Sequence, residues 1–389
     1  MDEKHISKVS AVALNDIFGF EPKFSHRIID ALGSAEAVFS LSESEKISVF
    51  GPYSKYLPQI NDSSLEAAEK QLDALENDGY GVLTIYDEGY PAALRDCVDA
   101  PMVLYVRSST PPEEIFNRRT AVSIVGTRDI SMYGKEWCER IVKALSQAPE
   151  KPMIVSGMAI GVDITAQMAA LCFGLPTVGV LPVGINDIYP HRHRVAADKI
   201  CATPGCAMVT DYPPGTEAMA NHFLRRNRII AGIGQSTILI ESKAKGGGMM
   251  TCRLSASYGR EVFALPGRID DIRSEGCNLL IKEKVAEPVY SLEELPAALG
   301  LGIWNRRQTR GLEDELRDLY SGDMEPEELE KTVRIASLVK KCRGISFDEI
   351  CESAGMDYAD VSRLAGILEN DGVINVDLIQ RCGINAKNY

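Results

Sequence analysis

Between residues 80 and 305 the chain alternates short, almost continuously apolar runs with stretches of helical periodicity. The runs are GVLTIY, MVLYV, AVSIVG, MIVSG, PTVGVLP, AMVTDY, TILIES and EVFALPG, and most of them end in Gly, Pro or Ser. Strands that are apolar on both faces and alternate with helices form a parallel sheet that is covered on both sides. The sequence therefore predicts an α/β fold with an extended Rossmann-like sheet that is doubly wound and mostly parallel. Such folds bind their ligands at the carboxyl ends of the strands.

The segments on either side of this region have a different pattern. Residues 1–78 carry apolar side chains at three- and four-residue intervals, which predicts a small helical domain of the SAM or helix-hairpin-helix type. Residues 79–305 are predicted to be the Rossmann-like domain, and residues 306–331 a linker. Residues 332–389 show the order helix, turn, helix, hairpin. This order predicts a winged-helix-like domain that follows the Rossmann-like domain at the C-terminal end of the chain.

Composition narrows the function classes. The chain has 389 residues, enough for two or three domains, and no apolar run approaches the roughly 18 residues of a membrane span. The start, MDEKHISKVS, lacks the apolar core of a secretory signal, so a cytoplasmic location without membrane contact is expected. The ten cysteines include no C-x-x-C pair, which favours free thiols. His191, His193, Cys201 and Cys206 lack the tight pair spacing of structural zinc sites, so no metal is expected.

One stretch departs from the acidic character of the chain. The net charge is −13, which argues against a protein that coats nucleic acid with its whole surface. Residues 217–260, however, contain seven basic residues and two acidic ones, the excess expected where a protein contacts a phosphate backbone. Phe223 adds an aromatic face on which a base could stack. The candidate DNA-binding residues in this stretch are Arg225, Arg226, Asn227, Arg228, Lys243 and Lys245.

The alternative for this stretch is a helix whose arginines pair with scattered acids while Phe223 lies in the core. Three arginines within four residues cannot all point the same way on a helix. At least one of them is therefore expected to be structural.

Loops after the predicted strands supply the remaining candidates. Gly126 permits a sharp turn, Thr127 is expected to cap the next helix, and Arg128 is expected to point across the strand ends. The fingerprint G-x-G-x-x-G is absent, so no NAD or FAD is expected, nor any other cofactor. Gly246 and Gly247 follow two lysines and offer backbone amides to an anion.

A further loop follows the strand MIVSG. Ser156 and Gly157 end that strand, Gly161 allows a close approach of backbone, and exposed amides at such a turn suit a phosphate. Asp163 stands at the helix start, where a carboxylate is favourable as a cap but would repel a bound anion. We therefore interpret Asp163 as a structural brace.

Taken together, these strings resemble the DNA-processing protein A family, also called DprA or Smf. The resemblance rests on the ordered segments SIVGTR, SGMAIGVD, LPVGINDIYP, FLRRNRIIAGIG, TILIESKAKGGGMMT, GREVFALPG and GCNLLI, and covers roughly residues 123–281. It implies a bacterial, non-enzymatic protein that binds single-stranded DNA and protects it during natural transformation. It also implies loading of the RecA recombinase onto that strand, and a homodimer formed through the Rossmann domain.

The resemblance also assigns residues. The family's arginine after the first strand matches Arg128, and its Phe-x-x-Arg-Asn-Arg segment matches Phe223 to Arg228. Its basic Ser-Gly loop matches residues 243–248, where Gly246, Gly247 and Gly248 replace the usual Ser-Gly-Ser. Ile160 stands where the family usually has arginine, and Asp211 where it usually has glutamate.

Two other hypotheses compete with this one. Rossmann proteins of the lysine-decarboxylase-like group hydrolyse the glycosidic bond of nucleoside monophosphates with a Pro-Gly-Gly-x-Gly-Thr loop, of which KGGGMMT has only a part. A transcription factor would read duplex DNA through the C-terminal domain. From Arg343 to Tyr389, however, there are eight acidic residues against four basic ones, and the expected recognition helix begins with Asp357 and Asp360. A module that contacts protein is expected there instead.

Overall fold

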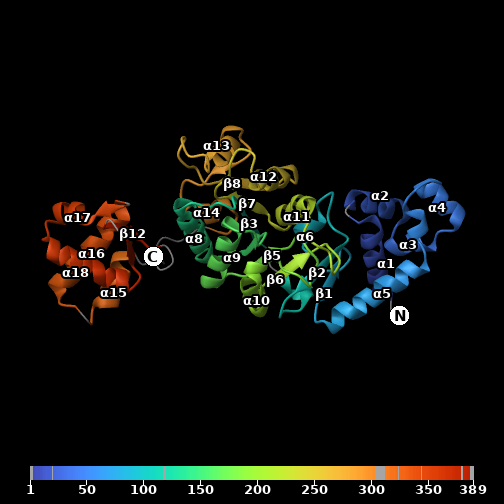
Figure 1. The fold of residues 1–389 in the computed structure, drawn as a ribbon, viewed down its shortest axis with the longest axis horizontal. Helices are drawn as coiled ribbons and strands as arrows, with labels where there is room; N and C mark the ends of the chain where they lie inside the picture. The colour runs from blue at the N-terminus through green and yellow to red at the C-terminus, as the bar shows by residue number, and fades with distance from the viewer. Residues whose placement is uncertain are drawn as a thin grey trace. The chain divides into compact units, whose positions relative to one another are not determined.

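The computed structural model describes residues 3–19, 21–116, 120–302, 312–322, 324–342, 344–377 and 380–385. The chain forms two compact units, Met1–Ile303 and Trp304–Tyr389 (Figure 1). Among the described residues, no helix is both long and apolar enough to span a membrane. The ten cysteines are all free thiols.

A nine-stranded sheet organises the first unit, with the strand order β1-β2-β6-β5-β4-β3-β7-β8-β9. From β6 to β9 all neighbours are parallel, whereas β2 runs antiparallel to both β1 and β6. This confirms the predicted doubly wound, mostly parallel sheet, and each of the eight predicted runs is a strand. The strands are β1 (Gly81–Thr84), β2 (Val103–Arg107), β3 (Ala121–Val125), β4 (Met153–Ser156), β5 (Thr177–Val180), β6 (Ala207–Thr210), β7 (Ser236–Leu239), β8 (Glu261–Ala264) and the short β9 (Glu287–Pro288).

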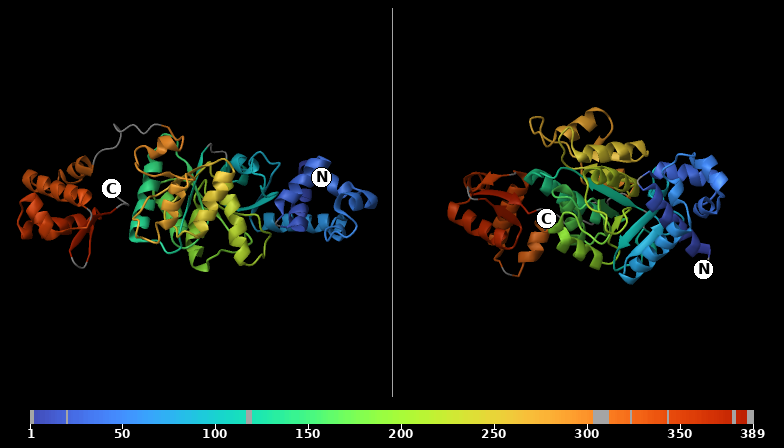
Figure 2. Two further views of the ribbon diagram at one scale, coloured as in Figure 1. Left: turned by 90° about the horizontal axis from the view of Figure 1, so that it is seen from above. Right: turned by 45° about the vertical axis from the view of Figure 1, so that its right-hand side comes forward.

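Helices cover both faces of this sheet because alternate residues of each strand point to opposite sides. In β3, Val122 and Ile124 pack with α8 (Met132–Ser146), α9 (Val162–Cys172) and α14 (Leu295–Ala298). Val125 points the other way, into a core with α6 (Ala92–Arg95), α11 (Ala220–Ile233), α12 (Gly247–Ser257) and α13 (Glu275–Lys282). The two helical layers can be followed in the views of Figure 2.

Five helices precede the sheet: α1 (Glu3–Phe18), α2 (Pro22–Leu32), α3 (Ala35–Ser40), α4 (Glu43–Phe50) and α5 (Asp62–Asn77). Apolar residues of α1 and α5 share a core with β1, β2 and α10 (Arg194–Ala202). Asn15 Nδ2 donates to the Asp211 carbonyl at 3.2 Å, and Gln71 Nε2 donates to the Tyr105 hydroxyl at 2.8 Å. The helical segment predicted over residues 1–78 is thus joined to the sheet in one compact unit.

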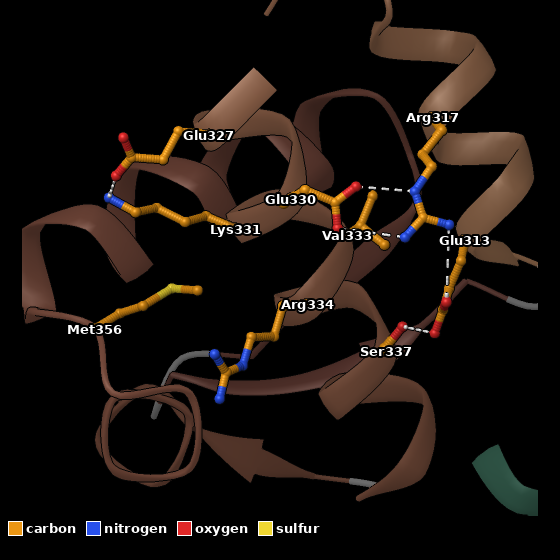
Figure 3. Close-up of a pocket in the computed structure, with 9 residues that line it drawn as sticks. All are labelled: Glu313, Arg317, Glu327, Glu330, Lys331, Val333, Arg334, Ser337 and Met356. Carbon is orange, nitrogen blue, oxygen red and sulfur yellow. Dashed lines mark hydrogen bonds and ion pairs between the residues drawn. The ribbon is translucent and has the colours of Figure 1, made fainter. Parts of the chain in front are cut away.

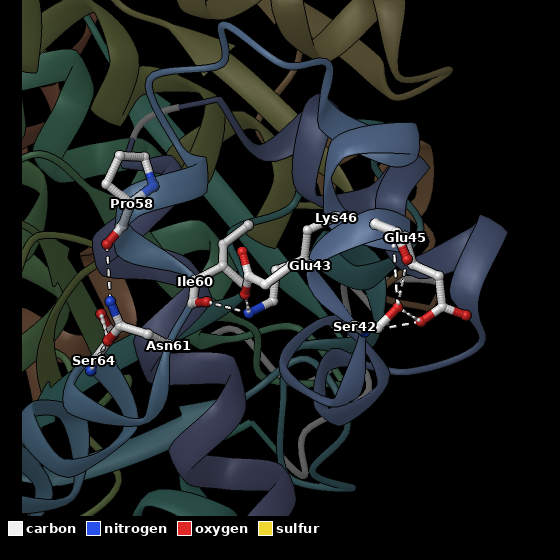
Figure 4. Close-up of polar contacts among 9 residues, drawn as sticks. Ser42, Glu43, Glu45, Lys46, Pro58, Ile60, Asn61 and Ser64 are labelled. Atoms are coloured by element: carbon white, nitrogen blue, oxygen red, sulfur yellow. Dashed lines mark hydrogen bonds and ion pairs between the residues drawn. The ribbon is translucent and has the colours of Figure 1, made fainter.

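Helix α4 reverses the usual pattern of burial. Its buried residue is Lys46, whereas Ile47 and Val49 are exposed. Lys46 Nζ donates to the Ile60 carbonyl and to Glu43 Oε1, both at 2.8 Å (Figure 4). A capping box between Ser42 and Glu45, with both reciprocal contacts present, begins the helix.

The second unit has the element order α15 (Leu312–Tyr320), α16 (Pro326–Lys341), β10 (Ile345–Ser346), α17 (Phe347–Ala354), α18 (Tyr358–Asn370), β11 (Ile374–Val376) and β12 (Arg381–Ile384). Its antiparallel strands have the order β10-β12-β11. Residues 306–311 and 323 of the predicted linker lie outside the described residues. For α15 the linker prediction is wrong, because Leu312, Leu316 and Tyr320 lie in the core of this unit. The prediction failed there because α15 is short and highly charged. That the unit is a winged helix stays a prediction.

A pocket in the second unit is lined by charges that largely neutralise one another (Figure 3). Arg317 Nε lies 3.0 Å from Glu330 Oε1, and Lys331 Nζ lies 3.4 Å from Glu327 Oε1 and 3.1 Å from Asp360 Oδ2. On α18, Arg363 pairs with Glu328 and Asp360. Paired cations of this kind give little attraction for a phosphate backbone.

Candidate nucleic-acid interface

The loops that follow β3 and β7 meet at the point where the sheet reverses its winding. These strands are parallel neighbours, with Val125 opposite Leu239, yet the chain leaves β3 toward β4 and leaves β7 toward β8. Ligands of open α/β sheets bind at such a switch point, outside the carboxyl ends of the strands. Thr127 N donates to the Glu241 carbonyl at 2.7 Å, and a Cβ on Gly248 would lie 3.2 Å from Gly126 Cα. The two loops are therefore in direct contact.

Four side chains on these loops and on α11 form what we term the cationic face: Arg128, Lys243, Lys245 and Phe223. Arg128, Lys243 and Lys245 are exposed. Within the described residues none of the three has a hydrogen-bonded or ion-paired acid. Helix α11 begins at this edge of the sheet and places Phe223 in its first turn, with Arg128 Cζ 5.2 Å from the ring centroid. Arg128 and Phe223 are thus in contact, and Lys243 and Lys245 lie on the adjoining loop after β7.

The ring of Phe223 already has two neighbours. Arg128 lies over it, and the Tyr189 ring meets it edge-on at a centroid distance of 5.1 Å and an interplanar angle of 71°. A cation over an aromatic face is held by the ring quadrupole. A base that stacks on Phe223 therefore uses its other face or displaces Arg128.

Among the helices that begin at this edge without a side-chain cap in the described residues are α9, α11 and α12. The N-cap residues are Gly161 for α9, Met219 for α11 and Gly246 for α12. Uncapped first turns carry N–H groups and a partial positive charge that suit a phosphate. By contrast, Ser131 caps α8 by accepting from Gly134 N at 3.0 Å. The prediction that Thr127 caps this helix is wrong, because Thr127 Oγ1 accepts from Asp129 N instead.

Arg226 lies inside the protein rather than on its surface. It is 4% exposed, and among the described residues its Nε and Nη1 atoms have no hydrogen-bond partner. A Cβ on Gly157 would lie within 2.6 Å of the Nη1, Cζ and Nη2 atoms of Arg226. Gly157 is therefore required because the guanidinium group presses against its backbone. Burial lowers the pKa of Arg226 to about 10, while the nearby Asp163 opposes this shift.

Asp163 is buried next to Arg226 and faces the turn after β4. Its Oδ2 accepts from Ala159 N at 3.3 Å. Burial raises the pKa of the Asp163 carboxyl, and the Arg226 charge and backbone hydrogen bonds act in the opposite direction. These contacts fit the predicted role of Asp163 as a brace, with Arg226 as its counter-charge.

Arg228 and Asn227 are buried as well. Arg228 Nη2 lies 2.5 Å from Asp211 Oδ2, and its Nη1 donates to the Asp99 carbonyl. The prediction that Arg226 and Arg228 hold the DNA backbone is therefore not supported, because their guanidinium groups are enclosed by protein. Of the three arginines, Arg225 is exposed.

Two further candidates also have internal roles. Ser156 is fully buried, and its hydroxyl donates to the Ile124 carbonyl at 2.6 Å, so it is not available to a ligand. Gly161 has a φ of +88°, and a Cβ there would lie 2.8 Å from the Arg128 carbonyl oxygen. Gly161 therefore lets its backbone lie close to the loop after β3. Gly246 and Gly247 lie in the loop at the start of α12, and Gly247 is exposed.

The loop after β5 also reaches this edge, although the sequence analysis selected none of its residues for DNA binding. Tyr189 contacts Phe223, and His193 Nδ1 lies 2.8 Å from the carbonyl oxygen of Met158, just after β4. The signal in the sequence was the run HRHR at residues 191–194. No group of three His, Cys, Asp or Glu side chains arranged to hold a metal ion occurs in the described part of the chain.

Comparison with known proteins identifies the family to which the chain is similar. Residues 81–300 match the family described as DNA recombination-mediator protein A. DNA processing protein DprA of Streptococcus pneumoniae is 35% identical over 200 residues, which are 51% of this chain and 68% of that protein. Protein Smf of Escherichia coli is 35% identical over 238 residues, 60% of this chain and 62% of that protein. About a third of each relative lies outside the match.

Two solved structures resemble the fold. The X-ray structure of DprA from Streptococcus pneumoniae superposes with a TM-score of 0.59 and 28% identity, over 76% of this chain and 96% of that one. A structure of DNA processing protein A from Helicobacter pylori, described by its single-stranded DNA binding mode, superposes with a TM-score of 0.50 and 28% identity. It covers 57% of this chain and 95% of that one.

Proposed function

The chain belongs to the DNA recombination-mediator protein A family, and from this premise we propose that it binds single-stranded DNA at its cationic face. The observation that carries the proposal is the convergence of Arg128, Lys243 and Lys245 at the switch point of the sheet. They are exposed in a chain of net charge −13, so they offer a polyanion a local positive surface on an otherwise acidic protein. The Helicobacter pylori relative with a described single-stranded DNA binding mode supports the same ligand.

Single-stranded rather than duplex DNA fits this face for two reasons. First, the face consists of loops and helix N-termini, which contact a backbone without entering a groove. Second, Phe223 offers a ring to a base, and only unpaired bases expose their faces for stacking. Contacts of this kind are tolerant of base sequence. We accordingly expect binding without strong sequence preference.

We further propose that the bound strand is handed to the RecA recombinase, and that the protein protects incoming DNA during natural transformation in the cytoplasm. Membership of a recombination-mediator family supports this role. We also propose a homodimer formed through the sheet-containing unit.

A hydrolase is the less favoured function, because carboxylates at these loops are engaged by other protein groups. Asp129, in the loop after β3, pairs with Arg273 at 3.0 Å. Both oxygens of Glu241 accept from Ser131, through its backbone N–H at 2.8 Å and its hydroxyl at 2.5 Å. Asp163 is buried against Arg226. General acid–base catalysis needs a carboxylate within reach of the substrate. Incubation with nucleoside monophosphates is expected to release no free base.

The experiment that tests the proposal compares a labelled single strand with a duplex of the same sequence by fluorescence anisotropy at moderate salt. The proposal predicts clearly tighter binding of the single strand, and competition by unlabelled single strands of unrelated sequence. Equal or tighter binding of the duplex would contradict the single-strand assignment. Release of base from nucleoside monophosphates would instead point to the hydrolase.

A further inference from the structure

The segment after β5 carries cations that the candidate site does not include. Arg192 and Arg194 are exposed, and they flank His193 where η2 (His191–His193) leads into α10. In the described residues neither guanidinium group has an ion-paired acid or a hydrogen-bond acceptor. Exposed arginines without a partner are available to an external anion.

The acids near this segment do not cancel its charge. Asp187 precedes the two arginines in the sequence, and its Oδ1 lies 3.6 Å from His191 Nδ1. Glu217 belongs to a neighbouring loop, which is tied to this one by the hydrogen bond from Gly184 N to Thr216 O at 2.9 Å. Asp198, on α10, pairs with Arg107 at 2.7 Å. In the described part of the chain, none of these three acids forms an ion pair with Arg192 or Arg194.

A continuous row of rings connects this segment to the cationic face. Arg128 lies over the Phe223 ring. The distance between ring centroids is 5.1 Å for Phe223 and Tyr189, and 6.4 Å for Tyr189 and His191. The hydrogen bond between His193 and the Met158 carbonyl holds η2 against the end of β4. The segment after β5 is therefore held at the end of β4, the strand that lies between β5 and β3.

The order of strands gives the direction of this row. Along the carboxyl edge of the sheet the strands follow one another as β5, β4, β3, β7. The arginines come after β5, Arg128 after β3, and Lys243 and Lys245 after β7. Three inter-strand spacings amount to about 14 Å, a length that about four stacked nucleotides would span at roughly 3.4 Å each.

We infer that His191–Arg194 is a second phosphate-binding arm, which extends the single-strand site across the sheet edge from the lysine loop to η2. The inference rests on the proposed function and adds the path of the strand and the residues at its far end. A strand that is too short to reach both ends contacts only the cationic face. A longer strand gains Arg192 and Arg194, and its binding should then depend more steeply on salt.

The test measures anisotropy for oligothymidines of about 2 to about 20 nucleotides, the shortest of which cannot span the sheet edge, with the wild type, the double variant Arg192→Ala/Arg194→Ala and the control Lys199→Ala. Lys199 is an exposed cation on the same helix α10. The inference predicts that the double variant binds the shortest strands as the wild type does, but loses about tenfold or more in affinity for the long ones. Its salt slope for long strands should fall by about 1.4, because each phosphate that is no longer neutralised lowers the slope by about 0.7. The control should match the wild type.

Three results would overturn the inference, and they can be told apart. If the double variant binds strands of every length as the wild type does, His191–Arg194 does not contact the strand, and the proposed function is unaffected. An equal loss at every length, including the shortest, shows that the segment acts by positioning Tyr189 and Phe223 and does not itself touch the strand. A wild type that binds no single strand refutes the proposed function, and the arm with it.

Discussion

Substituting Gly157 with alanine tests the account of the buried arginine. The new methyl group would lie within 2.6 Å of three guanidinium atoms of Arg226, closer than carbon and nitrogen can approach. The φ angle of Gly157 is not in the positive region, so the backbone itself can accept alanine. The destabilisation therefore comes from the collision alone.

The size of the destabilisation depends on whether the guanidinium group of Arg226 stays beside Asp163 or moves away from it. Overpacking of a buried site costs about 1–3 kcal/mol. If the guanidinium also moves away from Asp163, the loss approaches the roughly 3–5 kcal/mol of a broken buried ion pair. We expect Gly157→Ala to lower the free energy of unfolding by about 2–5 kcal/mol in total.

The assay is urea unfolding, followed through Trp137 fluorescence in a Trp304→Phe background so that the signal reports the unit containing the sheet. A double-mutant cycle with Arg226→Ala isolates the collision. Arg226→Ala alone should be destabilising because Asp163 stays buried without its counter-charge, but adding Gly157→Ala to it should cost less than about 0.5 kcal/mol. Additive costs of the two substitutions would refute the contact between Gly157 and Arg226.

Two further substitutions test other internal cations. Arg228→Ala should lower the free energy of unfolding by about 3–5 kcal/mol, because Asp211 would remain buried without its partner. The salt slope of single-strand binding should stay unchanged, and a fall of about 0.7 would show that Arg228 contacts a phosphate after all. Lys46→Ala should cost about 1–3 kcal/mol, since the Ile60 carbonyl loses its donor. Urea unfolding measures this against the exposed control Lys70→Ala, and equal stability of the two variants would show that the Lys46 hydrogen bonds contribute nothing.

The sheet could be predicted from the sequence because its strands are apolar on both faces. Runs such as AVSIVG and TILIES became β3 and β7, and the order of strands placed their loops together as expected. Helix α4 could not be predicted in the same way, because its inward residue is Lys46 while Ile47 faces solvent. In that helix a hydrogen-bonded lysine takes the place of an apolar side chain.

The sequence predicted that the loops after β3 and β7 lie together, but it counted as surface groups two arginines that the structure buries. Charge counting treats every arginine as a surface group, although a guanidinium group can be enclosed when an acid or a carbonyl accepts it. Arg226 stands three, four and seven residues before Ile229, Ile230 and Ile233, all of which are buried. This helical spacing was the available signal that Arg226 points inward.

The measurement that tests the central claim most directly is the salt dependence of single-strand binding in two triple variants of equal charge. One replaces Arg128, Lys243 and Lys245 by alanine. The control replaces three exposed lysines outside the cationic face, namely Lys23, Lys70 and Lys151. The account predicts that the first variant loses most of its affinity and about 2 from the salt slope, while the control stays close to the wild type. Equal behaviour of the two variants would show that net charge, rather than the cationic face, attracts the DNA.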